Sequence, residues 1–586
     1  MPSEWRDSIN IVVGGDAGQG VESSGAGLCL AFARGGLHVF SMQDYRSRIR
    51  GGHNFFQIRV SEGPTYSHSH FVHLLLALTA ETIKLHEDVM VSSGGVIYDE
   101  RLNVDAEALR VRGLQAFGMP LGDIAEEHGS RIMINTAAVA AAAGVTEWPF
   151  EYLESVIRDN FQVKGSQVVD TNLKVARAAY DVARERYAAR FSHKVLPVEA
   201  APRMLMNGNE AFCLGAVAGG CRFVSAYPMT PATSVIEWMS AAPRELGIVT
   251  KHAEDEIAAA CMAIGAAYAG ARAMTATSGG GFCLMVEALG LAGMTEVPLV
   301  VLEAQRGGPS TGLPTRTEQA DLLFALHAGQ GEFPRVVLAP GTVEECFEAG
   351  WRAFNLAERY QCPVIVLSDE FLASSLRTLE KDALDFSMVQ IDRGALLSSV
   401  ELDKLGGGYK RHAFTDTGIS PRAIPGHPNA VYASASDEHN ELGNITEEIV
   451  NRGRMMDKRM HKLDEAAREV RQPRWYGPQG AEVTLVCWGS TYGPAREAVN
   501  LLNANGARAN LLHFVDLWPF PEQVARTLSG CRRVVAVEQN YTSQLARLIR
   551  MCTGYSVDGV INKYDGRPFS PEDIVARLEV PHAPST

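Results

Sequence analysis

The run from Glu256 to Gly270 constrains this chain most, because EIAAACMAIGAAYAG is built largely from alanine and glycine. We expect a helix whose small side chains let neighbouring backbone approach closely, and which is therefore buried. Two short apolar runs, Arg222–Ala226 and Pro298–Ala304, flank it and are typical of strands. Each is followed by a loop, YPMTP or QRGGPSTG. Ligands of open α/β sheets bind outside the carboxyl ends of strands, so these loops are predicted to form a site.

Three acids, Glu254, Asp255 and Glu256, begin the helical run. Acids in a first turn complement the helix dipole, which explains all three without any function, and we prefer this explanation for Glu254 and Asp255. Glu256 lies deepest in the Ala/Gly run. There it is placed to share a proton with a ligand nitrogen.

The 586 residues suffice for three to four domains. We divide the chain into 1–192, 193–380, an irregular connecting segment with a helix at 381–478, and 479–586. The first, second and fourth of these alternate strands with helices, which predicts three α/β domains. The second shows six strands separated by helices, as in a doubly wound parallel sheet: FVSAY, GIVTKH, ARAMTAT, LVVLEAQ, RVVLAP and PVIVLSD.

The first domain begins with the strand SINIVVGG and the turn GGDAGQG, whose Gly18 and Gly20 would let backbone approach a phosphate at a helix N-terminus. Asp44, after the next strand, keeps a Rossmann nicotinamide site as the alternative. Against it, the turn is not G-x-G-x-x-G, and the Arg50–Gly52 loop has no place in that fingerprint. Further along we expect Arg131–Gly144 to be a strand.

Composition excludes several classes of partner. The net charge of −14 argues against nucleic acid, which needs a basic face. No apolar run approaches the ~20 residues that span a bilayer, and the first residues lack the features of a signal peptide, so we expect a cytoplasmic protein without a membrane partner. The ten cysteines include no C-x-x-C, so we expect neither an iron–sulfur cluster nor another metal on this chain.

Four motifs, in this order and spacing, carry a family resemblance: YPMTP, Glu256 with Gly265 and Gly270, ATSGGGF, and QRGGPSTGLPT. Together they resemble the α subunit of the thiamine-diphosphate-dependent 2-oxoacid:ferredoxin oxidoreductases, most of all the 2-oxoglutarate branch with a γ domain fused ahead of the α chain. The resemblance implies a γ-type domain, a pyrimidine-binding domain of a thiamine diphosphate enzyme, and a domain like the C-terminal domain of transketolase.

The resemblance also implies roles for residues. Glu256 would hydrogen-bond N1′ of the cofactor's aminopyrimidine, and Tyr227, Pro228 and Ser278 would contact the cofactor. Thr230, Arg306 and Arg316 would hold substrate carboxylates. Gly18, Gly20, Arg50, Gly51 and Gly52 would lie on the coenzyme A side.

Structural explanations compete for the three substrate residues. Thr230 is equally suited to cap the helix that follows it. Arg306 could form a surface ion pair, although the glycines and proline after it favour a functional loop. Arg316 could pair with Glu318 or Asp321 at a helix start.

The expected reaction is the oxidative decarboxylation of 2-oxoglutarate with coenzyme A. We find no G-D-G with a later N-N, the motif that holds the cofactor's diphosphate. The resemblance therefore implies a β subunit that carries the diphosphate site, Mg²⁺ and a [4Fe-4S] cluster, ferredoxin as acceptor, and an (αβ)₂ assembly. The alternatives are pyruvate or a branched-chain 2-oxoacid as substrate, a nicotinamide dehydrogenase, or a non-catalytic scaffold.

Overall fold

The computed structural model describes residues 8–46, 52–242, 244–406 and 408–578. The chain forms two compact units. The first extends to Asn207 and also takes in Ser374–Ala383 and Ser570–Glu572. The second contains the rest, and each unit is described by itself.

The first unit is built on an eight-stranded sheet with the order β6-β5-β4-β1-β3-β2-β14-β7. Neighbours from β6 to β1 are parallel, and all later pairs are antiparallel. The strands are β1 (Ser8–Asp16), β2 (His38–Asp44), β3 (His53–Ser61), β4 (Val72–Ala77), β5 (Met90–Asp99), β6 (Gln115–Met119), β7 (Met204–Met206) and β14 (Arg377–Leu379). In a Rossmann site β2 would lie parallel to β1. Here the antiparallel β3 separates the two strands, so Asp44 is not placed as in a dinucleotide site.

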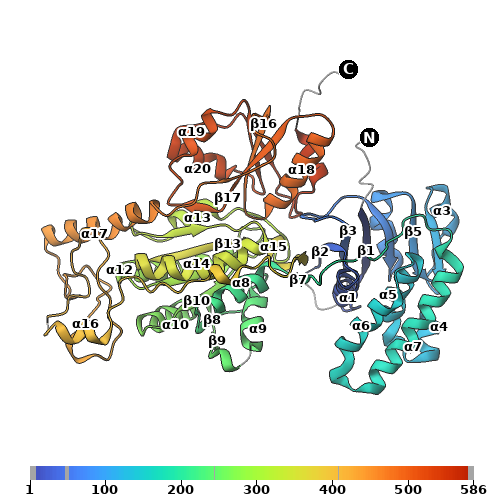
Figure 1. Ribbon diagram of the computed structural model, residues 1–586, viewed down its shortest axis with the longest axis horizontal. Coiled ribbons are helices and arrows are strands. Elements are labelled where there is room, and N and C mark those ends of the chain that lie inside the picture. The colour runs from blue at the N-terminus through green and yellow to red at the C-terminus, as the bar shows by residue number, and fades with distance from the viewer. Residues whose placement is uncertain (1–7, 47–51, 243, 407, 579–586) are drawn as a thin grey trace. The chain divides into compact units, whose positions relative to one another are not determined.

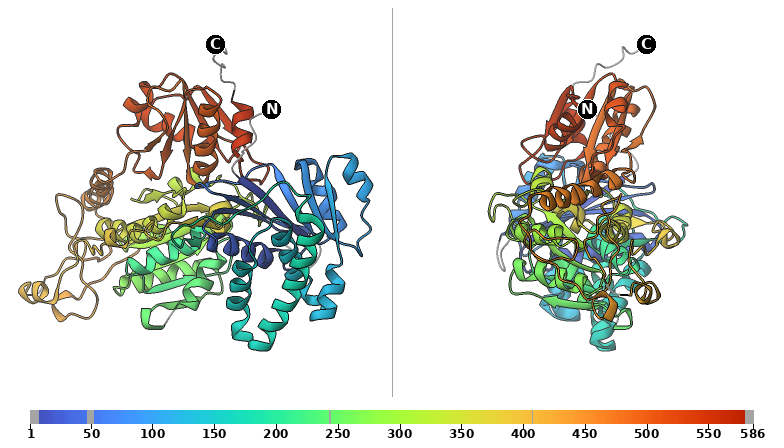
Figure 2. Two further views of the ribbon diagram at one scale, coloured as in Figure 1. Left: turned by 45° about the vertical axis from the view of Figure 1, so that its right-hand side comes forward. Right: turned by 90° about the vertical axis from the view of Figure 1, so that its left-hand side faces the viewer.

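Both faces of this sheet are covered, as strand alternation requires. Ile11 and Val13 belong to the core under the larger helices, and Val12 belongs to the core on the opposite face. The helices are α1 (Val21–Arg34), α2 (Ala80–His86), α3 (Ala106–Val111), α4 (Leu121–His128), α5 (Ile134–Val145), α6 (Phe150–Phe161) and α7 (Ser166–Ala183) (Figures 1 and 2). The expected strand at Arg131–Gly144 is wrong. Its alanines form α5, which is buried against α7.

The second unit contains a seven-stranded sheet with the order β18-β12-β13-β11-β10-β8-β9. The six strands expected from the sequence are all present and parallel, which confirms the doubly wound sheet. They are β8 (Phe223–Ala226), β9 (Val249–His252), β10 (Ala273–Thr277), β11 (Leu299–Gln305), β12 (Val336–Leu338) and β13 (Pro363–Asp369). The antiparallel β18 (Asp516–Trp518) comes from far along the chain and adds an edge beside β12. The sheet's helices are α8 (Gly208–Ala218), α9 (Thr233–Ala241), α10 (Glu256–Tyr268), α11 (Gly279–Leu284), α12 (Val286–Met294), α13 (Leu322–His327), α14 (Val343–Tyr360) and α15 (Glu370–Ser374).

Helix α10 is the Ala/Gly-rich segment, and it is buried on one face alone. Ala259, Ala260 and Ala263 are fully buried. On its other face Ile257 is 51% exposed, and Cys261 and Met262 are exposed as well. The expectation of a fully buried helix is therefore wrong, because small side chains permit close packing on every side but do not require it.

A five-stranded sheet follows, with the order β15-β17-β16-β19-β20. Its strands are β15 (Arg474–Tyr476), β16 (Val483–Trp488), β17 (Ala509–Phe514), β19 (Val534–Glu538) and β20 (Gly559–Asn562), and its helices are α18 (Tyr492–Ala504), α19 (Val524–Ser529), α20 (Gln544–Thr553) and α21 (Pro571–Arg577). Val486 and Leu548 of this region belong to the same buried cluster as Leu299 and Leu322 of the seven-stranded sheet's region. The two sheets of the second unit therefore share one core.

The described part of residues 384–473 contains two α-helices, α16 (Ser399–Lys404) and α17 (Ile449–Ala467), and two short 3₁₀ helices, joined by long irregular stretches (Figure 1). Helix α17 was expected from its charged, striped sequence, and the structure confirms it. Among the residues that the structure describes, no helix combines the length and the apolar character needed to cross a membrane.

Candidate active site at the carboxyl ends of β8, β10 and β11

Three glycines, Gly279–Gly281, form the meeting point of the predicted site loops. They begin α11 directly after β10. A Cβ on Gly281 would lie 2.7 Å from Cγ of Glu256, and one on Gly279 would lie 2.6 Å from an oxygen of Asp321. A Cβ on Gly280 would lie 3.9 Å from Sδ of Met229 and 4.0 Å from the main-chain oxygen of Ser310. The structure thus brings together the start of α10, the YPMTP loop and the Arg306–Asp321 loop.

Glu256 lies at the first position of α10 and is 4% exposed. The preceding Asp255 caps the helix, since its carboxylate accepts a hydrogen bond from the Ala258 amide at 2.7 Å. No described residue offers a hydrogen-bond partner to Oε1 of Glu256 or to Oγ of Ser278. Buried polar atoms are normally paired, so these two atoms mark a place where a ligand's polar groups fit.

The YPMTP loop follows β8. Tyr227 is 39% exposed, whereas Pro228 and Thr230 are half-buried. The capping position of α9 is Ala232, without a side-chain hydrogen bond, so Thr230 does not cap this helix. The main-chain oxygen of Thr230 instead accepts a hydrogen bond from Nη1 of Arg306 at 2.8 Å.

The loop after β11 is closed on itself. The amide of Gly307 donates to the oxygen of Arg316 at 3.0 Å, and the amide of Arg316 donates to the oxygen of Leu313 at 3.1 Å. This closure places the backbone of Arg316 beside Gly307, the residue that follows Arg306. Two arginines thus come from the base of one loop, at the carboxyl end of the central strand.

Three further carboxyl groups belong to this region: Glu303 lies in β11, and Glu318 and Asp321 lie in the last part of the loop. Glu303 is fully buried, and its burial, together with the neighbouring Asp321, raises its pKa well above the ordinary value. Burial and the charge of Asp321 raise the pKa of Glu318 to about 7. Protonation at Glu303 removes a negative charge that would otherwise repel an anionic ligand. Sequence reasoning missed Glu303, although a lone acid within the apolar run LVVLEAQ was a visible signal.

The glycine turn of the first unit has a backbone conformation that favours glycine. Gly18 and Gly20 have φ angles of 89° and 70°, a region that favours glycine. They line a cavity of about 480 Å³ with Asp16, Tyr45, Arg46, Asn54 and Phe55 among its other walls. Gly52 accepts a hydrogen bond from the Ala17 amide at 3.1 Å. Arg50 and Gly51 lie outside the described residues.

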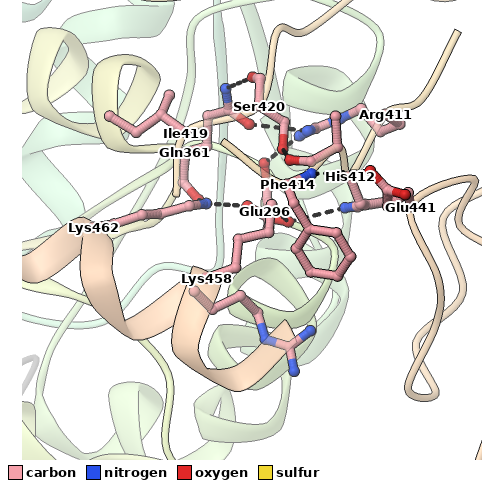
Figure 3. Close-up of polar contacts among 12 residues, drawn as sticks. Glu296, Gln361, Arg411, His412, Phe414, Ile419, Ser420, Glu441, Lys458 and Lys462 are labelled. Atoms are coloured by element: carbon pink, nitrogen blue, oxygen red, sulfur yellow. Dashed lines mark hydrogen bonds and ion pairs between the residues drawn. The ribbon is translucent and has the colours of Figure 1, made fainter. Parts of the chain in front are cut away.

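A second group of buried charges surrounds Glu296 (Figure 3). Glu296, just before β11, is fully buried and is held by Lys458 at 2.5 Å, by Lys462, and by Nδ1 of His412 at 2.9 Å. Its main-chain oxygen accepts a hydrogen bond from Arg411 at 2.6 Å. This buried charge cluster, Glu296 with Arg411, His412, Lys458 and Lys462, fastens α17 and the irregular segment to the sheet.

One oxygen or nitrogen from each of Glu296, His412 and His439 lies within 4.8 Å of the others, as metal ligands would. Lys458 and Lys462 already bind the two carboxylate oxygens of Glu296. Two ammonium groups at this distance repel a cation. The cluster is therefore a structural ion network.

Family models match three segments of the chain. Residues 214–458 match the thiamine-diphosphate-binding domain of pyruvate flavodoxin/ferredoxin oxidoreductases, and residues 10–182 match a pyruvate ferredoxin/flavodoxin oxidoreductase domain. Residues 481–574 match core domain II of pyruvate:ferredoxin oxidoreductase. The three matches follow the three sheets.

Full-length relatives and a solved structure agree with these matches. The chain is 34% identical to the 2-oxoacid:ferredoxin oxidoreductase subunit alpha of Sulfolobus sp, over 97% of this chain and 96% of that one. It is 30% identical to the 2-oxoglutarate oxidoreductase subunit KorA of Mycobacterium tuberculosis, over 97% of this chain and 90% of that one. A solved structure of 2-oxoglutarate:ferredoxin oxidoreductase comes from Magnetococcus marinus and has 2-oxoglutarate, coenzyme A and succinyl-CoA bound. It superposes on this chain with a TM-score of 0.90 at 34% sequence identity. The match covers 98% of this chain and 99% of that one. The chain belongs to the 2-oxoacid:ferredoxin oxidoreductases, as an α subunit with its γ-type domain in the same polypeptide.

Proposed function

We propose that this chain is the α subunit of a thiamine-diphosphate-dependent 2-oxoglutarate:ferredoxin oxidoreductase. The reaction converts 2-oxoglutarate, coenzyme A and two oxidised ferredoxins into succinyl-CoA, carbon dioxide, two reduced ferredoxins and one proton. The family names a 2-oxoacid substrate in general. The choice of 2-oxoglutarate is the specific part of the proposal.

The unpartnered, buried Oε1 of Glu256 is the observation that carries the cofactor assignment. It lies beside the glycine turn at Gly281, where any larger side chain would collide with it. When bound, thiamine diphosphate supplies the electron sink for decarboxylation. Glu256 holds a proton at N1′ of the aminopyrimidine, and Ser278, Tyr227 and Pro228 shape the space around the cofactor.

Two arginines support a dicarboxylate substrate. Arg306, fixed to Thr230 by its hydrogen bond, holds the carboxylate beside the reacting carbonyl, with the Thr230 hydroxyl as a further donor. A dicarboxylate brings a second carboxylate, whose burial is costly without a cation. Arg316, at the other end of the closed loop, is assigned to that distal carboxylate.

A β subunit completes the site. The face of α10 formed by Ile257, Cys261 and Met262 is exposed although it directly follows Glu256, as expected of a surface that a partner covers. We assign the diphosphate site, Mg²⁺ and the [4Fe-4S] cluster to this partner, in an (αβ)₂ assembly that reduces ferredoxin. Burial raises the pKa of the Cys213 and Cys346 thiols well above the ordinary value, so these buried cysteines are poor cluster ligands.

The glycine turn of the first unit is assigned to coenzyme A. Its cavity presents the amino end of α1 to a phosphate, a favourable place for negative charge. Gly18, Gly20 and Gly52 supply the close backbone approach. Arg50 and Gly51 complete the assigned loop in the sequence.

A substrate panel on the complex of this chain with its β subunit tests the proposal. Ferredoxin reduction is measured with 2-oxoglutarate, pyruvate and a branched-chain 2-oxoacid, each with coenzyme A. We expect kcat/KM for 2-oxoglutarate to exceed the others at least tenfold, and this chain alone to be inactive. A preference for pyruvate or the branched-chain acid would overturn the substrate, and an iron–sulfur cluster on the isolated chain would overturn the division between subunits.

A further inference from the structure

Gln319 marks the point where the C-terminal part of the chain reaches the loop Arg306–Asp321. Its side chain is fully buried. Its amide donates to the oxygen of Gln539 at 2.8 Å, and Nε2 donates to Asp369 at 3.1 Å and to the oxygen of Trp488 at 3.2 Å. The end of the loop is therefore fixed by residues far away in the sequence.

Gln544, at the start of α20, fixes the next residues of the same stretch. Its Nε2 donates to the oxygen of Ala320 at 2.6 Å, and its Oε1 accepts from the amide of Leu323 at 2.9 Å. Asn540 donates to the oxygen of Gln319 at 3.1 Å and accepts from the amide of Gln544 at 3.3 Å. The two amide side chains thus hold backbone on both sides of Asp321.

The same region also contacts the loop near Arg316. A Cβ on Gly566 would lie 3.0 Å from Cβ of Arg316, so glycine permits this close approach. The loop is closed by hydrogen bonds of its own between Gly307 and Arg316, and its tip at 308–313 is exposed. The hydroxyl of Thr317 donates to Asp369 at 3.2 Å, so the backbone just after Arg316 is also held. The backbone held from Thr317 to Leu323 and the contact at Gly566 therefore both bear on the position of Arg316.

From these contacts we infer that the C-terminal region, through Asn540 and Gln544, positions the substrate loop of the oxidoreductase. Gln544 is a positioning residue that acts through the backbone of Ala320 and Leu323 on Arg316. The inference rests on the proposed function in one respect, namely that Arg306 and Arg316 bind the 2-oxoacid. It gives the C-terminal domain a part in substrate binding in addition to its structural role.

The test uses the complex of this chain with its β subunit and the variant Gln544→Met, which keeps the side-chain length and removes both hydrogen bonds. Asn503→Leu is the matched control. Asn503 also makes two hydrogen bonds to backbone, both with Ala509, but inside the five-stranded sheet's own region. Hydrogen exchange of residues 307–317 measures how firmly the loop is held. KM for 2-oxoglutarate and KM for coenzyme A measure whether the loop contributes to binding of either substrate.

We expect Gln544→Met to speed exchange in residues 307–317 and to raise KM for 2-oxoglutarate fivefold or more, with KM for coenzyme A unchanged and kcat affected less. Exchange and KM values equal to those of Asn503→Leu would overturn the inference. If Gln544→Met does not fold, Asn540→Ala is judged by the same criteria.

Arg306→Ala, measured in parallel, separates this inference from the proposed function. Faster loop exchange in Gln544→Met, with KM for 2-oxoglutarate unchanged in both variants, would overturn the substrate role of the loop and leave its fixation by Gln544 standing. Unchanged exchange in Gln544→Met, with a raised KM in Arg306→Ala, would overturn the fixation of the loop by Gln544. It would leave the substrate role of the loop standing.

Discussion

Arg306 and Thr230 are joined by a hydrogen bond of 2.8 Å from the guanidinium to the main-chain oxygen, although 76 residues separate them in the sequence. The bond connects the loops that leave β8 and β11, two strands with β10 between them. Removing the guanidinium therefore removes the link between the two loops, together with the substrate contact that we propose for it.

Arg306→Ala should raise KM for the 2-oxoacid at least tenfold, the scale expected for loss of a buried charge-assisted hydrogen bond. Steady-state ferredoxin reduction by the complex measures the effect. Arg222→Ala is the control, because Arg222 precedes the opposite end of β8 and bonds the oxygen of Cys221. Equal KM values for the two variants would contradict the role of Arg306.

Glu256→Gln should leave folding intact and lower turnover by roughly 10²-fold or more, since an acid–base interaction is lost. Asp255→Asn should have a small effect, because asparagine caps a helix about as well as aspartate. Single-turnover decarboxylation separates the two variants. An equal loss of turnover in both variants would show that the start of the helix as a whole is needed and that Glu256 has no special role.

Arg316→Ala should weaken use of 2-oxoglutarate at least tenfold, through loss of the cation for the distal carboxylate. Any pyruvate activity should be spared, since pyruvate has no second carboxylate. The measurement is kcat/KM for both substrates on the same preparation. Equal losses with both substrates would assign Arg316 to loop structure.

Substrate binding should weaken as the pH rises through about 7, the pKa to which burial and Asp321 raise Glu318. Above this pH Glu318 carries a negative charge within the loop, and this charge repels the anionic substrate. We expect KM for 2-oxoglutarate to rise about threefold between about pH 6 and pH 8, an effect of a partly screened charge. Glu318→Gln should flatten the profile, whereas Glu332→Gln, at an exposed site, should not.

Glu296→Gln should lower the free energy of unfolding by about 3–5 kcal/mol, because it leaves Lys458 and Lys462 buried beside a neutral partner. The control Glu465→Gln, whose exposed partner Arg468 lies just after the end of α17, should cost at most about 1 kcal/mol. Urea unfolding measures both. Similar midpoints for the two variants would contradict the structural role of the cluster.

The same cluster sets a direction for acid sensitivity. Burial alone would raise the pKa of Glu296, but Lys458, Lys462 and His412 outweigh it and hold the pKa well below 4.5. The stabilisation is therefore complete above the unfolded-state pKa near 4.5 and is lost as the pH falls through the lower folded-state value. Glu296→Gln should flatten the stability profile on the acid side.

Strand ends and loop chemistry made much of the site predictable. Thr230 and Arg306 follow apolar runs, and Glu256 begins the Ala/Gly-rich run. The carboxyl ends of parallel strands lie at one edge of a sheet. The acid Glu303 was missed because it stands within a strand. The helix α5 was mistaken for a strand because its alanines give no periodicity.

Long-range pairings could not be predicted in the same way. The buried charge cluster draws Glu296, Arg411 and Lys458 from three separate segments, and no local pattern connects them. Strands β7 and β14 are three residues long, and β14 pairs through Arg377 with Phe40 of β2, far earlier in the chain. Such short strands are stabilised by their neighbours, so their sequences alone carry little signal.

The sheet orders have a consequence for synthesis on the ribosome. The first sheet needs β14 at Arg377–Leu379, and the second needs β18 at Asp516–Trp518. At roughly 5–20 residues per second, the strand β2 emerges many seconds before its partner β14 does. The nascent chain therefore carries open sheet edges at β2 and then at β12, and open edges invite pairing with other chains. Neither sheet is complete until late in translation, which makes the unfinished polypeptide a natural client for chaperones.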